Sequence, residues 1–187
     1  MKLSGKKIAI LATHGFEQSE LEVPLQKLKE AGATVHVVSP EKGEIRGWDK
    51  KDWGRPVKVD RLIEDAKVDD YDAVVLPGGQ INPDLLRVNS DALEFIRGFF
   101  DQKKVVAAVC HAPWLLVETG IAKGRRMTSY HSMKTDVINA GAKWEDSEVV
   151  NDQGVITSRN PGDLAAFSAK IIEEVAEGRH TKRSAAA

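Results

Sequence analysis

The chain has 187 residues, of which 42% are hydrophobic and 29% charged, and its formal net charge is −1 at pH 7. This length predicts one domain with a buried core at residues 1–178, followed by a flexible tail at 179–187. The balanced charge argues against nucleic acid or an anionic membrane as partner, and no apolar run approaches the ~18 residues of a membrane span. A single cysteine excludes an internal disulfide and favours a reducing cytoplasm.

Apolar runs of strand type alternate with stretches of helical periodicity. In chain order, the pattern predicts a strand at 7–13, a helix at 17–31, a strand at 34–39, a hairpin within 44–60, a strand at 73–76, a helix at 91–102, a strand at 105–109, helices at 112–119 and 133–140, strands at 149–151 and 155–158, and a helix at 164–177. Ser90 and Ser132 are expected N-caps. Strands separated by helices predict an α/β three-layer sandwich, in which a mostly parallel sheet carries helices on both faces.

Three loops of this sheet are candidate site segments. In parallel sheets, ligands bind at the carboxyl ends of strands, near a reversal of the strand order. This rule selects residues 14–20, 78–84 and 110–114, each of which follows a predicted strand. In the first segment, His14 directly follows the strand and is a candidate to reach the cleft. We therefore expect these three loops to meet and to build the site.

Cys110 lies between a buried strand and a helix, which is the layout of a nucleophile elbow. The first amides of the helix favour negative charge, so we expect them to lower the pKa of the thiol. Pro113 fits the first turn of that helix. The adjacent His111 is a candidate general base, although neighbouring side chains usually point apart. The alternatives are a small buried hydrophobic residue at position 110 and a surface histidine at position 111.

The other two loops offer partners for this thiol. Gly78 and Gly79 end a strand, and an open amide there would form an oxyanion hole with the amide of His111; an ordinary turn is the alternative. Glu17 and Glu20 lie three residues apart at a helix start, where acids also satisfy the helix dipole. We expect only one of these two carboxylates to face the cleft.

No metal or nucleotide motif accompanies these residues. The five histidines contain no close pair at i, i+4 and the chain has one cysteine, so we expect no zinc site. Neither glycine-rich nucleotide signature occurs, and we expect no cofactor. Trp48 and Trp53 flank the turn of the expected hairpin. They suit a cross-strand pair, a subunit contact or the rim of a neighbouring subunit's site.

With these segments placed, the chain resembles the PfpI-like intracellular proteases, in the superfamily of the parkinsonism-associated deglycase. The resemblance implies a flavodoxin-like sheet of the class I glutamine amidotransferase type. Each matching motif is weak alone, whereas the ordered set is specific. The motifs are FEQSE at 16–20, YDAVVLPGG at 71–79, AVCHAP at 108–113, GRRMTSY at 124–130, NAGA at 139–142 and TSRNPGD at 157–163.

The resemblance also implies a role for each matching residue. The nucleophile falls on Cys110, its neighbouring histidine on His111, and the acid that hydrogen-bonds the thiol on Glu20. A carboxyl group beside a thiolate is expected to be protonated. The oxyanion amides fall on Gly79 and His111. Tyr130 matches a tyrosine that lines the site.

The loop after the two glycines departs from the family pattern. Members often carry an acid there that orients the histidine of a neighbouring subunit. Here the loop reads Gln80-Ile81-Asn82-Pro83-Asp84 and is one residue longer, with Asp84 in place of glutamate. Asp84 is thus the candidate for the catalytic acid that orients His111; the alternative is that its shorter side chain on a shifted loop misses His111, which disfavours peptidase activity. The family pattern also implies a homodimer or a higher oligomer.

Three functions are compatible with this sequence. The first is a stress-response hydrolase whose Cys110 thiolate attacks the electrophilic carbonyl of a 2-oxoaldehyde, such as methylglyoxal, or of an early glycation adduct on a protein or nucleotide. The second is a non-catalytic redox sensor or holdase that uses oxidation of Cys110. The third is an intracellular cysteine peptidase. Small carbonyl substrates are favoured because the expected triad acid is displaced.

Overall fold

The computed structural model describes residues 2–183 and contains a central sheet of seven strands. The strands of this sheet are β1 (Lys7–Leu11), β2 (Thr34–Ser39), β5 (Arg61–Leu62), β6 (Ala73–Leu76), β7 (Val105–Val109), β10 (Val149–Asp152) and β11 (Val155–Ser158). Their order is β10-β11-β7-β6-β1-β2-β5. All neighbours pair in parallel except β10, which runs antiparallel to β11.

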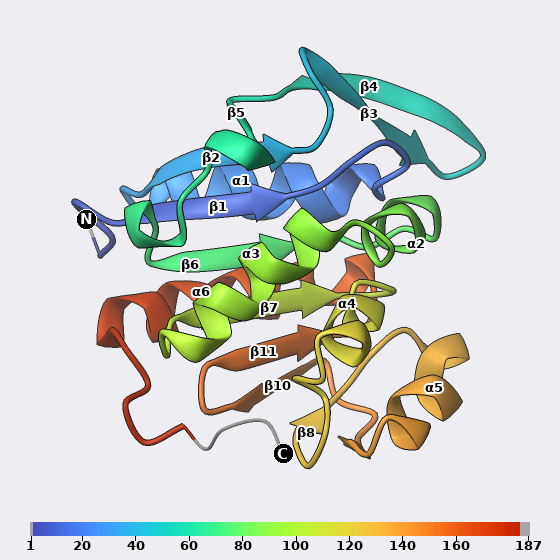
Figure 1. Cartoon of the computed structure of the whole chain (residues 1–187). Coiled ribbons are helices and arrows are strands. Elements are labelled where there is room, and N and C mark those ends of the chain that lie inside the picture. The colour runs from blue at the N-terminus through green and yellow to red at the C-terminus, as the bar shows by residue number, and fades with distance from the viewer. Residues whose placement is uncertain (1, 184–187) are drawn as a thin grey trace.

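Helices cover both faces of this sheet (Figure 1). They are α1 (Gln18–Glu30), α2 (Ile81–Leu86), α3 (Ser90–Asp101), α4 (Pro113–Glu118), α5 (Lys134–Asn139) and α6 (Leu164–Glu177), with one-turn 3-10 helices η1 (Ile63–Asp65), η2 (Val68–Asp70), η3 (His131–Met133) and η4 (Pro161–Asp163). Leu21 of α1 and Phe167 of α6 pack on one face, and Phe99 of α3 and Leu115 of α4 on the other. The predicted α/β sandwich is confirmed.

The apolar strands of the sequence form the middle of this sheet. Every residue of β6 and β7 is buried. Successive side chains of β7 alternate between the two faces, so that Val106 and Ala108 join one hydrophobic cluster and Val105 and Ala107 the other. A parallel sheet covered on both sides requires apolar residues at every strand position, which explains the continuous runs.

The strand order brings the three candidate loops together. From β2 the order runs to β1, then to β6, β7 and β11, so the direction of winding reverses between β1 and β6. The loops after β1, β6 and β7 therefore leave neighbouring strands at the same carboxyl edge. Chain segments far apart in sequence thus meet at one place.

Two predicted N-caps differ from the structure. The cap of α3 is Asn89, whose Oδ1 accepts from the amide of Ala92 at 2.9 Å, and Ser90 is already helical. Adjacent asparagine and serine are both good caps, so the sequence does not separate them. Ser132 caps no helix, because η3 precedes α5 and the latter starts at Lys134 without a side-chain cap.

The region 44–60 forms the predicted hairpin, from β3 (Glu44–Asp49) and β4 (Asp52–Lys58). Trp48 and Trp53 make a cross-strand pair with ring centroids 5.6 Å apart. A second small sheet pairs β8 (Arg126–Met127) with β9 (Lys143–Trp144). Within the described residues, no helix is long and apolar enough to span a membrane.

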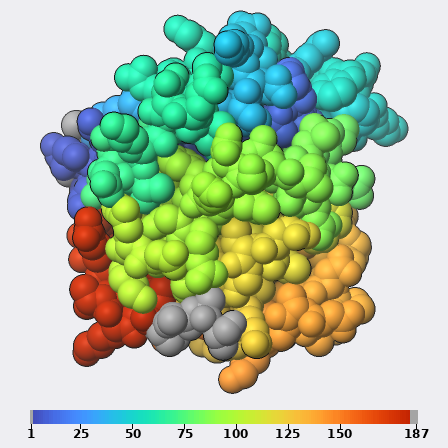
Figure 2. Space-filling view, viewed as in Figure 1, coloured from blue at the N-terminus to red at the C-terminus, as the bar shows by residue number. Residues whose placement is uncertain are grey.

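His180 and Arg183, within the expected flexible tail, contact the body of the domain, whereas the residues at 179, 181 and 182 are exposed. Arg183 is only 3% exposed, and its guanidinium donates to the carbonyl of Gln153 at 2.6 Å and to that of Phe100 at 3.3 Å. The amide of His180 donates to the carbonyl of Lys103 at 2.9 Å. In Figure 2 the red C-terminal part of the described chain borders yellow-green atoms of the α3 region. The basic residues, which indicated a solvent-exposed end, instead include the donor of hydrogen bonds to the carbonyls of Gln153 and Phe100. Residues 184–187 lie outside the part of the chain that the structure describes.

Candidate active site

Cys110 occupies the predicted sharp turn between β7 and α4. Its φ is +62°, a conformation that non-glycine residues rarely adopt, and its amide donates to the carbonyl of Ser158 at 3.0 Å. Pro113 stands at the start of α4, as predicted. The Cys110 side chain, 5% exposed, borders a cavity of about 370 Å³. The cavity is lined by Gly15, Glu17, Glu20, Trp48, Gly79, Gln80, Ile81, Cys110, His111, Tyr130 and Pro161.

The positive φ of Cys110 brings two neighbouring side chains together. The thiol sulfur lies 3.1 Å from Nδ1 of His111. The other ring nitrogen, Nε2, lies 3.4 Å from Oγ of Ser132. The imidazole stacks on Tyr130 with centroids 4.7 Å apart. Burial and, to a smaller extent, His131 lower the pKa of His111, so this ring is neutral at pH 7 and can accept a proton.

Glu20 reaches the same sulfur from the start of α1. The residue is fully buried, and Oε2 accepts from the amide of Gly78 at 2.8 Å. The carboxyl group also lies close to the Cys110 side chain, an interaction that lowers the pKa of Glu20, and Oε1 has no hydrogen-bond partner among the described residues. Burial and, to a smaller extent, the Glu17 carboxylate raise the pKa of Glu20 to about 8. At neutral pH the group is therefore mostly protonated and can donate to sulfur, as the resemblance implied.

Opposing influences act on the thiol of Cys110. Burial raises its pKa most and an ionised Glu20 raises it further, whereas amide hydrogen bonds from Gly79 and His111 lower it. The net direction is upward, so the expectation of a lowered pKa was wrong for the free protein. The reason is that burial removes more hydration than two amides replace. Protonation of Glu20 removes its carboxylate charge, and the pair then holds one negative charge at most.

The two glycines do more than form a turn. A Cβ atom on Gly78 would lie 2.5 Å from Oε2 of Glu20 and 2.7 Å from Cβ of Cys110. Gly79 has φ +77°, and a Cβ there would lie 2.5 Å from the carbonyl oxygen of Gly15. Both positions therefore require glycine so that three loops can approach closely. The amides of Gly79 and His111, which were predicted to form an oxyanion hole, both face the sulfur.

Two residues of the first loop, His14 and Glu17, are engaged outside the reacting pair. His14 does not line the cavity, because the chain turns at Gly15 and Nδ1 of His14 accepts from the amide of Arg46 at 3.1 Å. Glu17 is among the residues that border the cavity, but its Oε2 accepts from the Glu20 amide at 2.9 Å, so that only the Glu20 carboxyl group is directed at the reacting pair. Glu17 caps α1 and still reaches the edge of the cavity.

Asp84 lies on the exposed side of α2 and does not line the cavity. None of the hydrogen bonds in residues 2–183 joins it to His111, whose Nε2 instead faces Ser132. Within one chain Asp84 completes no triad, in line with the longer loop. Its role toward a neighbouring subunit stays a prediction.

Sequence reasoning missed several residues of this site. Trp48 lines the chain's own cavity, because its amide donates to the carbonyl of Phe16 at 2.7 Å and so holds β3 over the first loop. Ile81 of α2 lines the cavity, and its side chain lies so close to Gly15 that a Cβ atom on Gly15 would be 2.4 Å from Cβ of Ile81. Ser132 was considered only as a helix cap. None of these contacts leaves a signal in sequence spacing.

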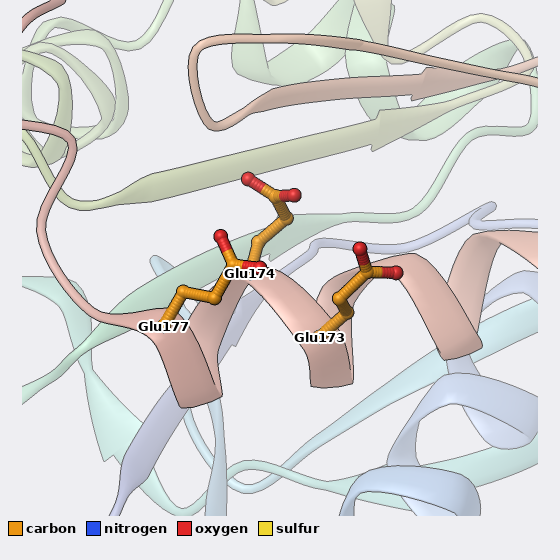
Figure 3. Close-up of side chains that lie close together, drawn as sticks. All are labelled: Glu173, Glu174 and Glu177. Atoms are coloured by element: carbon orange, nitrogen blue, oxygen red, sulfur yellow. The ribbon is translucent and has the colours of Figure 1, made fainter.

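One acidic cluster in the described residues has carboxylates close enough to share an ion. It consists of Glu173, Glu174 and Glu177 on the last turns of α6 (Figure 3). Two of these side chains are exposed, and Glu174 is paired with His180 at 3.3 Å. The cluster lies at the end of α6 remote from Pro161, which borders the cavity. It is therefore separate from the cysteine site.

Comparison with known proteins extends along most of the chain. The model of the DJ-1/PfpI family matches residues 6–174. The chain is 42% identical over 167 residues to "Deglycase PfpI" of Pyrococcus furiosus, covering 89% of this chain and 98% of that protein. It is also 42% identical over 171 residues to "General stress protein 18" of Bacillus subtilis, covering 90% and 96%. The crystal structure of Drosophila melanogaster DJ-1beta superposes with a TM-score of 0.83 at 32% identity, covering 91% of this chain and 90% of that one.

Proposed function

Because the chain belongs to the DJ-1/PfpI family, we propose that it is a cysteine-dependent hydrolase of the deglycase type. Its Cys110 attacks the carbonyl carbon of a 2-oxoaldehyde or of an early glycation adduct. The observation that carries this proposal is the set of groups around one sulfur, namely Nδ1 of His111, the carboxyl of Glu20 and two backbone amides. Relatives named as deglycases support the substrate class.

The first step is addition of the thiol to the carbonyl. The S–H proton passes to Nδ1 of His111, the sulfur bonds to the carbon, and the π electrons of C=O move to oxygen. The amides of Gly79 and His111 face this region and stabilise the developing negative charge. Protonated Glu20 then supplies the proton that neutralises the oxyanion and becomes a carboxylate, and it regains a proton when the product leaves.

The adduct has two outcomes, depending on the substrate. With a free 2-oxoaldehyde, the former aldehyde hydrogen leaves as a proton and returns to the neighbouring carbon. The aldehyde carbon is thereby oxidised to a thioester while the ketone carbon is reduced to an alcohol, and water then releases a 2-hydroxy acid. With an early glycation adduct, the sulfur displaces the amine, which leaves with a proton, and the resulting hemithioacetal then follows the same hydrogen shift to the thioester. Neither route requires an external electron acceptor.

The dimensions of the cavity favour small substrates over extended peptides. Its volume of about 370 Å³ lies at the low end for ligand sites. Apolar side chains from Trp48, Ile81 and Tyr130 form much of its wall. A three-carbon aldehyde and the end of the side chain that it modifies fit this space. In one chain, moreover, no acid completes a peptidase-like triad with His111.

The test is loss of methylglyoxal in metal-free buffer, comparing the freshly reduced protein with Cys110→Ala and Cys110→Ser. We expect turnover only by the unaltered chain, with a fall of more than about 10³-fold in both variants. Equal loss with Cys110→Ala would contradict the proposal. Parallel incubations with a fluorogenic peptide and with peroxide identify the alternatives. Peptide cleavage without aldehyde loss indicates a peptidase, and a mass gain at Cys110 without any turnover indicates a redox sensor.

A further inference from the structure

Ser132 is held beside the reacting pair by the backbone. The amide of Tyr130 donates to the carbonyl of Cys110 at 2.8 Å, and the amide of Met133 donates to the carbonyl of Tyr130 at 3.0 Å. Met133 is fully buried, which anchors η3 in the core. The Ser132 hydroxyl is thereby carried to 3.4 Å from Nε2 of His111. This distance is long for a hydrogen bond, and such contacts commonly tighten when substrate binds.

The imidazole of His111 is restrained on its faces and at both nitrogens. Tyr130 stacks against it at a 27° interplanar angle, and Trp114 approaches edge-on with centroids 5.3 Å apart. Nδ1 faces the sulfur of Cys110, and Nε2 faces Ser132. The ring therefore has one partner for each nitrogen within the same chain.

The groups around the sulfur determine which nitrogen carries the proton. The amides of Gly79 and His111 are donors, and protonated Glu20 is a donor as well. Nδ1 of His111, 3.1 Å from the sulfur, is the neutral base that the described residues place beside the S–H proton. Nδ1 must then be unprotonated in the free protein, so Nε2 carries the hydrogen and requires an acceptor. The hydroxyl oxygen of Ser132 is the acceptor that the structure places there.

We propose that Ser132 is the positioning residue for His111: its Oγ accepts the Nε2 hydrogen, fixing the tautomer whose Nδ1 takes the proton from Cys110. This inference rests on the proposed function and assigns the orienting role to the chain itself. Transfer of the S–H proton leaves an imidazolium with a hydrogen on each nitrogen, and Ser132 keeps its hydrogen bond throughout. The serine hydroxyl supplies no charge.

Ser132 does not line the cavity, so its effect is separable from substrate binding. In Ser132→Ala we expect kcat for methylglyoxal to fall about 5-fold with KM unchanged, the scale of one uncharged hydrogen bond. Ser132→Thr retains the hydroxyl and restores kcat. Thr135→Ala, at an exposed position on α5, is the matched control and leaves both constants unchanged.

A spectroscopic measurement reads the tautomer without any substrate. In the full chain labelled with ¹⁵N-histidine, the His111 signals are assigned by their loss in His111→Gln. We expect a protonated Nε2 in the unaltered protein and in Ser132→Thr, and a mixture of tautomers in Ser132→Ala. A protonated Nδ1 in the unaltered protein, or identical spectra and kcat in Ser132→Ala, would overturn the proposal. Absence of turnover by the unaltered chain would refute the proposed function alone, because the tautomer would still be measured.

Discussion

The two edges of the central sheet treat buried charge in opposite ways. At the amino edge, Lys104 is 5% exposed and its ammonium donates to the carbonyl of Val68 at 2.7 Å. Arg183 is also buried and donates to the carbonyl of Phe100 in α3 and to that of Gln153 between β10 and β11. At the carboxyl edge, Glu20 is fully buried and accepts a hydrogen bond from the amide of Gly78. Its carboxyl group also lies beside the Cys110 side chain.

The buried cations at the amino edge therefore have a structural role, whereas the buried carboxyl group at the carboxyl edge is placed for chemistry. A cation held by fixed carbonyls keeps its proton, and the contact joins two parts of the chain. Burial raises the pKa of both the Glu20 carboxyl group and the Cys110 thiol, so each holds a proton at neutral pH that it can give up during a reaction. The carboxyl edge also holds the positive φ of Cys110, which adds strain. The site is therefore expected to be less stable than an equivalent apolar packing.

The largest effect is expected from a single methyl group at the carboxyl edge. In Gly79→Ala the new Cβ would lie 2.5 Å from a carbonyl oxygen and 2.7 Å from an amide nitrogen, and neither can move freely. We expect the free energy of unfolding to fall by more than about 3 kcal/mol and turnover to be lost. Urea unfolding and the methylglyoxal assay measure both.

Gly124 is the matched control for this substitution. Its φ is also +77°, but a Cβ there meets nothing within 4 Å. Gly124→Ala is therefore expected to cost only the conformational term, about 1 kcal/mol, and to leave turnover intact. Equal destabilisation of the two variants would show that backbone conformation, not close approach of the loops, requires glycine at position 79.

The second-largest effect is expected from Glu20→Gln, which tests how much the buried carboxyl group reduces the free energy of unfolding. Its pKa rises from 4.5 to about 8 on folding, so the folded state holds the proton more tightly. The resulting stabilisation is complete below pH 4.5 and is lost as the pH rises to 8. Glu20→Gln stays neutral throughout. The variant is therefore expected to be more stable above pH 8, by about 5 kcal/mol at most, and to turn over more slowly.

Urea unfolding at pH 5 and at pH 8.5 checks this sign. The gain in Glu20→Gln should be small at pH 5 and large at pH 8.5. The exposed residue Glu94 offers the control Glu94→Gln, which should change little at either pH. A gain for Glu20→Gln that is the same at both pH values would mean that protonation of this carboxyl group is not linked to folding.

The smallest effect is expected at the amino edge. Burial and, secondarily, Arg179 lower the pKa of Lys104, and its hydrogen bond to Val68 offsets part of that cost. In Lys104→Met the apolar stem is kept while the charge is removed. We expect the free energy of unfolding to change by no more than about 1 kcal/mol, with turnover unchanged. A marked loss of turnover would mean that the two edges are coupled.

Much of the fold was predictable because burial on both faces leaves a plain sequence pattern. The core strands at 73–76, 105–109 and 155–158 and the helix at 164–177 have the predicted bounds. Strands β5, β8 and β9 were not predicted, because two residues are too few for a periodicity. The contacts of His180 and Arg183 with the body of the domain were not predicted either. They are hydrogen bonds made by basic residues, and a basic composition is usually associated with exposure to solvent.

The sequence by itself determined the order of strands and helices along the chain and the turn that holds Cys110. It also determined the segments after β1 and β6 that carry Glu20 and Gly79. Each of these features depends on local periodicity or on residues adjacent in the chain. Only the tertiary structure decided the position of Trp48 over the cavity, the contact between Ser132 and His111, and the direction of the thiol pKa. Those features depend on which segments are brought into contact and on how much water they exclude, and neither quantity is carried by the spacing of residues.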